Sequence, residues 1–336
     1  MRLAVLADRL ILGGLETHIV TYANELLRRG HHLLLYTAFI EPGLLAQIDR
    51  AGGRFLHREW TERTVEDIAA FRPEVIHAHP FTAIVKGCRA AAALGRPFVI
   101  TMHEYYDFGL DHSTLGREVG STVHTVIAID RGIESYLREH IICPEKLTVI
   151  HNGIDLARFA PLPHDGAGRA RLGLEPAWFT ICTVSRFDNG KERPVYQLLR
   201  CAPALAEALG GVNLIIVGGG SWYDDIRERA AALAASHPAV RTHVAGYRLD
   251  VLPYLAAADL VVACDRAAME AMACARPVFA GNANGYAGLI DAGNGAEILS
   301  ARRGYRPCDD EEFSAALIAL GRAENELRRA AEAGRE

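Results

Sequence analysis

The chain of 336 residues contains no long apolar run, no dense cluster of basic residues and no regular cysteine spacing. Met1 and Arg2 lead into a short apolar run that Asp8 and Arg9 interrupt, which is too short for a signal peptide or a membrane span. The chain also lacks the Lys/Arg runs with interleaved aromatic residues that mark nucleic-acid-binding proteins. We therefore expect a cytoplasmic protein without an integral membrane segment or a nucleic-acid partner.

Metal and disulfide patterns are missing as well. The cysteines are odd in number and scattered, at positions 88, 143, 182, 201, 264, 274 and 308. They form no Cys-x-x-Cys pair and no His/Cys cluster with zinc spacing, so we read them as reduced thiols. No Asp-x-Asp stands at the end of an expected strand, where a metal-bridged pyrophosphate would need one. The prediction is that the protein has no metal site and no cofactor.

What the chain does contain is alternating strand and helix patterns in both halves. Apolar residues make up 50%, charged residues 23%, and the formal net charge is −5, which is ordinary for globular domains. Strands are expected at 3–7, 32–37, 75–79, 98–102, 126–129, 179–184, 212–217, 240–244, 260–263 and 277–280, with helices between them. Such alternation predicts parallel sheets covered by helices.

The length favours two domains, and a stretch rich in proline and glycine between residues 159 and 168 is the best linker candidate. We expect a Rossmann-like domain over 1–158, a linker over 159–176 and a second Rossmann-like domain over 177–336. Two doubly wound α/β domains facing each other across a cleft would bring both sets of strand ends together.

Three residues in the second half carry the strongest chemical signal. Arg186 and Lys191 follow the strand at 179–184, and Glu270 is expected to open a helix that runs to Pro277. Ligands of open α/β sheets bind at the carboxyl ends of strands, where helix N-termini favour anions. Two cations there can hold a diphosphate, and the carboxylate can hold a ribose diol. The alternative is that Arg186 and Lys191 are solvated loop charges.

Other candidates have two readings each. Gly13 and Gly14 either approach a phosphate or only turn the chain, and they do not form the Gly-x-Gly-x-x-Gly of a dehydrogenase. Gly218 and Gly219 either approach a ligand or form a plain turn. His103 lies at a strand end beside Glu104 and Tyr105. His77 and His79 share one face of a strand and could resemble metal ligands, but no third ligand is placed near them.

The order of these motifs resembles the retaining GT-B glycosyltransferases of family 4, from Met1 to about Arg329. The matching segments are Leu12-Gly-Gly-Leu-Glu-Thr17, Thr101-Met-His103, His151-Asn-Gly-Ile-Asp155, the Arg186/Lys191 pair, Val217-Gly-Gly-Gly220, the strand entry Ala256–Leu260 and the segment Glu270-Ala-Met-Ala-Cys274.

The resemblance implies site roles. Arg186 and Lys191 would neutralise the departing diphosphate, and Glu270 would hold the ribose. His103 would lie beside the donor sugar. The expected catalytic residues are therefore His103, Arg186 and Lys191. Tyr247, Arg248, Gly218 and Gly219 would line the nucleotide, and Glu104 and Tyr105 would face the acceptor. Gly13, Gly14, Asp265 and Arg266 would be candidates for the donor sugar and phosphates.

The sequence departs from the family pattern in one loop. The family places a first glutamate before the second, and counting back from Glu270 reaches Val262, inside an expected strand. Asp265 and Arg266 are the only charged residues between that strand and Glu270. They either take over part of the missing role or are a helix N-cap and a surface charge. The family also commonly ends on a helix that crosses back onto the first domain, whereas here a charged stretch at 323–332 is the last expected helix.

The resemblance thus implies a metal-independent retaining enzyme that moves a sugar from a nucleotide diphosphate, most simply UDP, to a hydroxyl of a small molecule, glycan or lipid-linked acceptor. Two alternatives stay open. One is a nucleotide-sugar epimerase of the same fold, and the other is a non-catalytic binding or partner subunit. The sequence names neither the sugar, the acceptor nor the oligomeric state.

Overall fold

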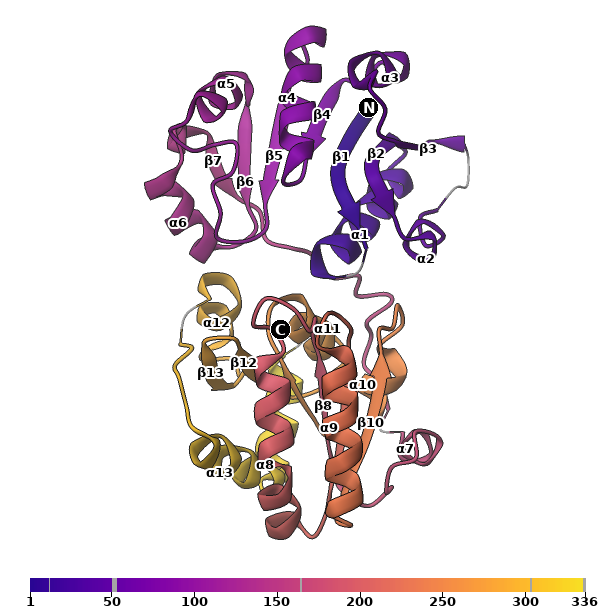
Figure 1. The fold of residues 1–336 in the computed structure, drawn as a ribbon, viewed down its shortest axis with the longest axis vertical. Helices are drawn as coiled ribbons and strands as arrows, with labels where there is room; N and C mark the ends of the chain where they lie inside the picture. Colours follow the sequence, from indigo (N-terminus) through magenta and orange to yellow (C-terminus); the bar gives the residue numbers. More distant parts are fainter. Residues whose placement is uncertain (12, 50–52, 164, 303, 335–336) are drawn as a thin grey trace. The chain divides into compact units, whose positions relative to one another are not determined.

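A computed structural model describes residues 1–11, 13–49, 53–163, 165–302 and 304–334. The chain divides into two compact units, Met1–Gly153 and Ile154–Glu336. The first unit therefore ends at Gly153 rather than at residue 158. Both units are Rossmann-like α/β folds, as the alternating sequence pattern predicts (Figure 1).

The first unit is built on a parallel sheet with the strand order β3-β2-β1-β4-β5-β6-β7. Its strands are β1 (Arg2–Leu10), β2 (His32–Ile40), β3 (Phe55–Glu59), β4 (Val75–Ala78), β5 (Phe98–Met102), β6 (Thr125–Ala128) and β7 (Leu147–Val149). The chain reverses its direction of winding between β1 and β4, which are neighbours in the sheet. In open α/β sheets this switch point is where ligands bind, at the carboxyl ends of the strands.

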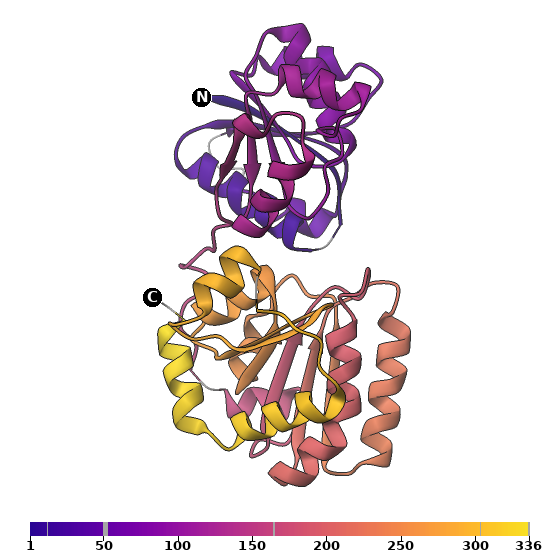
Figure 2. The ribbon, with the colours of Figure 1, turned by 90° about the vertical axis from the view of Figure 1, so that its left-hand side faces the viewer.

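Helices cover both faces of this first sheet (Figure 2). They are α1 (Gly14–Arg28), α2 (Pro42–Leu45), α3 (Thr64–Phe71), α4 (Thr82–Leu94), α5 (Thr114–Thr122) and α6 (Arg131–His140), with a short 3₁₀ helix at Pro144–Lys146. Helix α1 forms because Ile19, Val20, Ala23 and Leu27 recur on one buried face. Gly30, at φ 82°, follows its end and turns the chain toward β2.

The second unit has the strand order β10-β9-β8-β11-β12-β13, in which only the β12–β13 pair is antiparallel among the described residues. Its strands are β8 (Phe179–Val184), β9 (Val212–Val217), β10 (Val240–Gly246), β11 (Leu260–Ala263), β12 (Val278–Asn282) and β13 (Gly285–Leu289). Here the winding reverses between β8 and β11, which places the ends of these two strands side by side.

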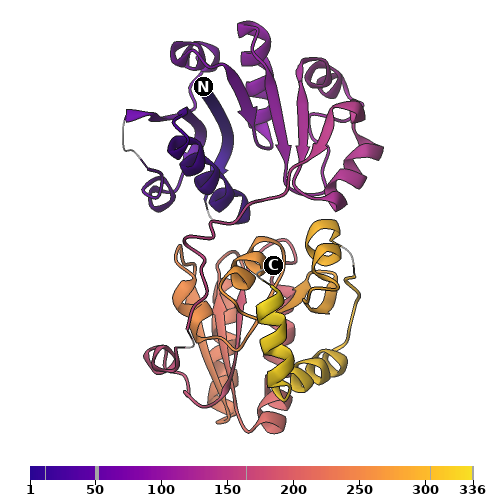
Figure 3. The same cartoon turned by 180° about the vertical axis from the view of Figure 1, so that it is seen from behind.

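Two buried clusters lie on the two faces of the second sheet (Figures 1 and 3). One contains residues of α8 (Arg193–Leu209), α9 (Tyr223–Ser236), α13 (Asp310–Gly321) and α14 (Glu324–Ala333). The other contains residues of α10 (Leu252–Ala257), α11 (Asp265–Ala273) and α12 (Gly295–Ala301). Alternate residues of β9 enter the two clusters, Leu214 and Ile216 in one and Ile215 in the other, which is the period of a strand buried on both faces.

The segment expected as a linker packs onto the second unit instead. Phe159 is 4% exposed, and α7 (Gly166–Arg171) begins where the side chain of Asp165 accepts a hydrogen bond from the Gly168 amide. Arg169 on this helix is buried and pairs with Asp259 at 2.7 Å. A helix of six residues is too short to show a hydrophobic period, so its composition alone resembled a linker.

Candidate functional site

The loop after β8 carries Arg186 and Lys191 and is tied to the loop after β9. Phe187 is fully buried, and its amide donates to the Gly219 carbonyl at 2.9 Å. The Ser221 amide donates to Asp188 at 2.8 Å, and this bond lowers the pKa of the Asp188 carboxyl. Arg186 is exposed, Lys191 is half-buried, and α8 begins just after Lys191, at Arg193.

The loop after β9, residues 218–220, consists of glycines because it lies so close to the loop after β8. A Cβ on Gly218 would collide with the Ser185 carbonyl oxygen, and one on Gly220 would collide with the Asp188 carboxylate. Both residues also have positive φ, at 156° and 142°. The close approach of the two loops therefore explains why glycine stands at these positions. A role in ligand binding is not needed to explain it.

Tyr247 and Arg248 form the third neighbouring loop, after β10. The Gly218 amide donates to the Gly246 carbonyl at 3.0 Å, and a Cβ on Gly219 would lie 3.3 Å from the Cβ of Tyr247. Arg248 is folded back onto its own segment, where its Nε donates to the Tyr254 hydroxyl at 3.1 Å. The structure thus brings the Arg186/Lys191 loop, the glycine loop and Tyr247 together at one sheet edge.

Glu270 lies within α11 rather than at its start, which corrects the sequence expectation. The helix already begins at Asp265, because the turn from β11 takes only one residue, Cys264. Glu270 is therefore one turn inside the helix. Its side chain is 12% exposed, and its Oε1 accepts a hydrogen bond from the Arg266 Nε at 2.8 Å. Burial raises the pKa of Glu270, and the positive charge of Arg266 opposes that rise.

Two further readings at this helix were wrong. Arg266 is not a surface charge, because its side chain is only 6% exposed and pairs with Glu270. Asp265 is not the N-cap, since the capping position is occupied by Cys264 without a side-chain bond. Asp265 instead has φ of 51° and lies 3.8 Å from the Nε of Arg302. Val262, the position of the expected first glutamate, is buried in the middle of β11.

In the first unit, Gly13 and Gly14 enter α1 after β1. Gly13 has φ of 164°, which is extended backbone open to any residue, so no left-handed turn requires glycine there. Thr17 instead ties the turn, since its hydroxyl donates to the Gly13 carbonyl at 3.1 Å. The interpretation of Gly13 and Gly14 as a turn that needs glycine is therefore weakened. The close approach of their backbone to a ligand stays a prediction.

His103 follows β5 and belongs to a cluster of imidazole rings with His18, His77 and His79. His79 Nδ1 lies 2.8 Å from His103 Nε2, and the rings of His18 and His103 are 5.3 Å apart. His77 and His79 point to the same side, as the strand period predicts, with ring centroids 4.5 Å apart. His77 Nε2 lies 2.7 Å from the Thr101 hydroxyl, and its Nδ1 lies 3.2 Å from the Tyr22 hydroxyl.

His77 and His79 are buried, and burial makes both rings hard to protonate. Burial, and next the charge of His18, lowers the pKa of His77 to about 3. Burial lowers the pKa of His79 well below 6.5 as well, and the neighbouring histidines add to the effect. Within the described ranges, no group of three or more His, Cys, Asp or Glu side chains is placed to hold a metal ion.

Acidification is therefore expected to destabilise the first unit. The unfolded chain protonates His77 below pH 6.5, whereas the native state does so only near its folded pKa of about 3. Native stability is then lost progressively as the pH falls through this window. At pH 5 the loss from His77 alone is about 2 kcal/mol.

This loss can be measured by urea denaturation followed through Trp60 fluorescence, with Trp178 and Trp222 replaced by phenylalanine. His77→Asn should make the free energy of unfolding less dependent on pH between 6.5 and 5. His112→Asn, which changes an exposed histidine, should leave the pH dependence as in the wild type. Equal slopes in the wild type and in His77→Asn would contradict the prediction.

The loops beside His103 carry exposed aromatic rings. Phe81 is 45% exposed and lies 4.8 Å from the Tyr106 ring and 5.7 Å from the Phe108 ring. Phe108 is 38% exposed, and Tyr105 is 48% exposed with its ring 5.8 Å from that of Tyr136. These rings follow β4 and β5, so they share a sheet edge with His79 and His103. The sequence motif indicates Tyr105 but not Phe81 and Phe108, because only the tertiary structure brings the two loops together.

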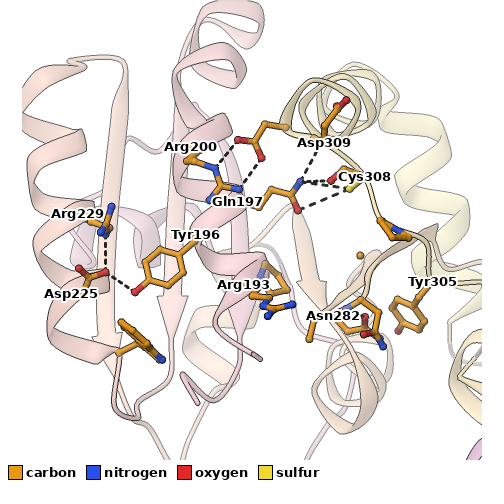
Figure 4. Close-up of a pocket in the computed structure, with 17 residues that line it drawn as sticks. Arg193, Tyr196, Gln197, Arg200, Asp225, Arg229, Asn282, Tyr305, Cys308 and Asp309 are labelled. Atoms are coloured by element: carbon orange, nitrogen blue, oxygen red, sulfur yellow. Dashed lines mark hydrogen bonds and ion pairs between the residues drawn. The ribbon is translucent and has the colours of Figure 1, made fainter. Parts of the chain in front are cut away.

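A broad open groove of about 1170 Å³ lies on the second unit, along α8 and the start of α9 (Figure 4). Its other wall contains the β12–β13 turn, Tyr305 and residues 307–310. Tyr196 donates to Asp225 at 2.5 Å, and Arg200 pairs with Asp310 at 2.6 Å, so much of the lining is already bonded within the protein. None of the site residues expected from sequence lines this groove, and no sequence motif marked it.

The two Rossmann-like units are those of the GT-B fold, and comparison with known proteins identifies the family. Residues 12–158 match the family model Glycosyltransferase Family 4, and residues 179–322 match Glycosyl transferases group 1. The chain belongs to the family 4 glycosyltransferases. In the described ranges no helix is both long and apolar enough to cross a membrane.

Individual relatives are distant. D-inositol 3-phosphate glycosyltransferase 1 of Catenulispora acidiphila is 28% identical, over 91% of this chain and 82% of that protein. The GDP-mannose-dependent alpha-(1-6)-phosphatidylinositol monomannoside mannosyltransferase of Mycolicibacterium smegmatis is 24% identical, over 96% of this chain and 88% of that protein. The crystal structure of Anabaena HepE in complex with UDP-glucose has a TM-score of 0.75 at 19% identity, covering 100% of this chain and 93% of that one.

Proposed function

We propose that the protein transfers a sugar from a nucleotide diphosphate, UDP in the first instance, to a hydroxyl acceptor with retention at the anomeric carbon. The observation that carries this proposal is the meeting of three loops at the carboxyl edge of the second sheet, where the strand next to β8 leads into α11. The loops bear Arg186 and Lys191, the close-packed glycines and Tyr247, and α11, which bears Glu270, follows β11, the strand that pairs with β8. The edge includes the switch point between β8 and β11.

Each side chain has a role that suits its chemistry. Arg186 and Lys191 offset the charge that develops on the leaving diphosphate, as preorganised donors do in a transition state. Glu270 holds the ribose hydroxyls, and Arg266 keeps its carboxylate in place. In the retaining reaction the bond from the anomeric carbon to the diphosphate breaks as the acceptor oxygen bonds on the same face. The acceptor proton passes to the departing phosphate oxygen, so no protein nucleophile is needed.

The acceptor is proposed to bind the first unit near Glu104 and Tyr105. The exposed rings of Tyr105, Phe81 and Phe108 offer an apolar surface there, of the kind that marks binding sites. The names of two relatives contain inositol phosphates or phosphatidylinositol. Inositol phosphates are accordingly the first acceptors to test.

The donor can be tested by a thermal-shift screen of UDP, GDP, ADP and their sugars. A ligand at 100 times its dissociation constant stabilises the native state by about 2.7 kcal/mol. We expect UDP to give the largest shift, and a larger shift with GDP would move the assignment to GDP-mannose, the donor named for the Mycolicibacterium relative.

The alternative functions need a second experiment. Slow release of nucleotide from the sugar donor without acceptor would separate a competent enzyme from a binding subunit. Sugar analysis of the product would separate transfer from epimerisation.

Activity is expected to survive EDTA. The cations Arg186 and Lys191 would stabilise the leaving group, which is the task of a metal ion in enzymes that use one. The measurement is the initial rate after treatment with EDTA, compared with the same enzyme supplied with Mg²⁺. Complete loss with EDTA and recovery with Mg²⁺ or Mn²⁺ would show that the leaving group needs a metal.

Glu270→Gln is expected to weaken binding of a nucleoside diphosphate by about tenfold or more and to leave binding of pyrophosphate nearly unchanged. The amide keeps the shape of the side chain but loses charge-assisted bonds worth about 1.5–3 kcal/mol each. Isothermal titration with UDP and with pyrophosphate measures both. An equal loss for the two ligands would assign Glu270 to α11 packing alone.

A further inference from the structure

The hydrogen bond between His79 and His103 needs one donor and one acceptor. His79 follows β4 and His103 follows the neighbouring strand β5, and the two side chains meet at 2.8 Å through His79 Nδ1 and His103 Nε2. His79 is fully buried and His103 is 8% exposed. A neutral imidazole carries its proton on one nitrogen and a lone pair on the other. The bond therefore admits two arrangements of protons.

The second nitrogen of His79 distinguishes them. His79 Nε2 is buried and has no hydrogen-bond partner in the part of the chain that the structure describes. If His103 donated to His79, the proton of His79 would sit on Nε2 as a buried N–H without an acceptor. If His79 donates, Nε2 holds only a lone pair. Orphaned buried N–H groups are the rarer defect in native proteins.

His77 shows the contrast. It lies beside His79 on the same side of the sheet, but each of its nitrogens has a hydroxyl partner, from Thr101 and from Tyr22. Hydroxyls can donate or accept, so they leave the proton of His77 unassigned. In contrast to His77, the His79–His103 pair dictates where its protons lie.

We propose that His79 donates its Nδ1–H to Nε2 of His103 and so fixes His103 as the tautomer with its proton on Nδ1. His79 is then a positioning residue. The Nε2 lone pair of His103 is engaged, so this ring offers a hydrogen-bond donor at Nδ1 rather than a general base. This consequence for catalysis rests on the proposed transferase function, and it agrees with the acceptor proton passing to the leaving phosphate.

The tautomer can be read directly from two-bond ¹H–¹⁵N correlation spectra of the full chain labelled with ¹⁵N-histidine. His103→Gln assigns the ring signals of His103. We expect the wild type to show a protonated Nδ1 and an unprotonated Nε2 at His103. A protonated Nε2 at this ring in the wild type would overturn the proposal, whether or not the protein transfers a sugar.

Two substitutions at His79 extend the test. His79→Asn keeps an amide N–H near the place of Nδ1 and is expected to keep the tautomer, whereas His79→Leu removes the donor and should leave both tautomers populated. His112→Asn, at an exposed histidine of the same unit, should change nothing. Should His79→Leu fail to fold, the wild-type and His79→Asn spectra still decide the point.

The catalytic consequence has its own readout. His79→Leu is expected to lower kcat for release of nucleotide from the sugar donor by about tenfold or more, with little change in the donor KM, and His79→Asn should restore most of it. If His79→Leu alters the tautomer of His103 but leaves kcat unchanged, the assigned tautomer is supported and the catalytic consequence is contradicted. An enzyme without transferase activity would count against the proposed function but not against the assigned tautomer.

Discussion

Replacing Lys191 with alanine is expected to lower kcat for sugar transfer by about 10²-fold to 10³-fold, which corresponds to about 3–4 kcal/mol of transition-state stabilisation. Lys191 is half-buried and lies between the end of β8 and the start of α8, so it is held at the sheet edge where the diphosphate would leave. Arg186→Ala should act in the same direction. The exposed Arg186 has more freedom to move, so its loss should cost less.

The chain offers a matched control two residues along. Arg193 is also a cation after β8, but it is exposed and lines the groove of α8 instead of joining the three loops. Arg193→Ala should keep kcat within about twofold of the wild type. Steady-state kinetics of all three variants with one sugar nucleotide makes the comparison. Turnover within twofold of the wild type in both Lys191→Ala and Arg186→Ala would remove the diphosphate assignment.

Arg266→Ala is expected to lower the free energy of unfolding of the second unit by about 3 kcal/mol at pH 7. The substitution leaves the buried Glu270 carboxylate without its partner, and breaking a buried ion pair from one side is costly. The value lies at the lower end of the usual range because Glu270 keeps 12% exposure. Urea denaturation in a Trp60→Phe background reports this unit through Trp178 and Trp222.

The pH dependence of this loss identifies its cause. Burial already raises the pKa of Glu270, and removing Arg266 removes a charge that holds it down. In the variant the native state therefore binds a proton at a higher pH than the unfolded chain does, so its stability deficit should shrink as the pH falls from 7 toward 5. A deficit that is constant over this range would point to lost packing instead.

An exposed ion pair in the same unit provides the control. Arg229 and Asp225 are also four residues apart on a helix and lie at 2.7 Å, but their side chains are 63% and 39% exposed. Arg229→Ala should destabilise the unit far less than Arg266→Ala does, because water screens the pair and solvates the remaining carboxylate. Similar losses for Arg266→Ala and Arg229→Ala would contradict the role of burial.

The sequence determined the architecture because hydrophobic periodicity is a local property. Short, mostly apolar runs gave the bounds of β8, β9 and β11 correctly, and helices lie between the strands as expected. Shorter elements escaped notice. Strand β7 has only three residues and α7 only six, which is too few for a period to appear. Order of motifs along the chain then sufficed to indicate the glycosyltransferase family.

Tertiary structure decided what the polar residues do. A sequence places Arg266 four residues before Glu270, but only the packing of α11 shows that both are buried and paired. Likewise His79 and His103 are far apart in the chain, and they meet because β4 and β5 are neighbours in the sheet. Periodicity reports which residues face the core, since that depends on nearby residues alone. The partner of a charge, the position of a proton and the reason for a glycine depend on contacts between distant segments, and these exist only once the chain has folded.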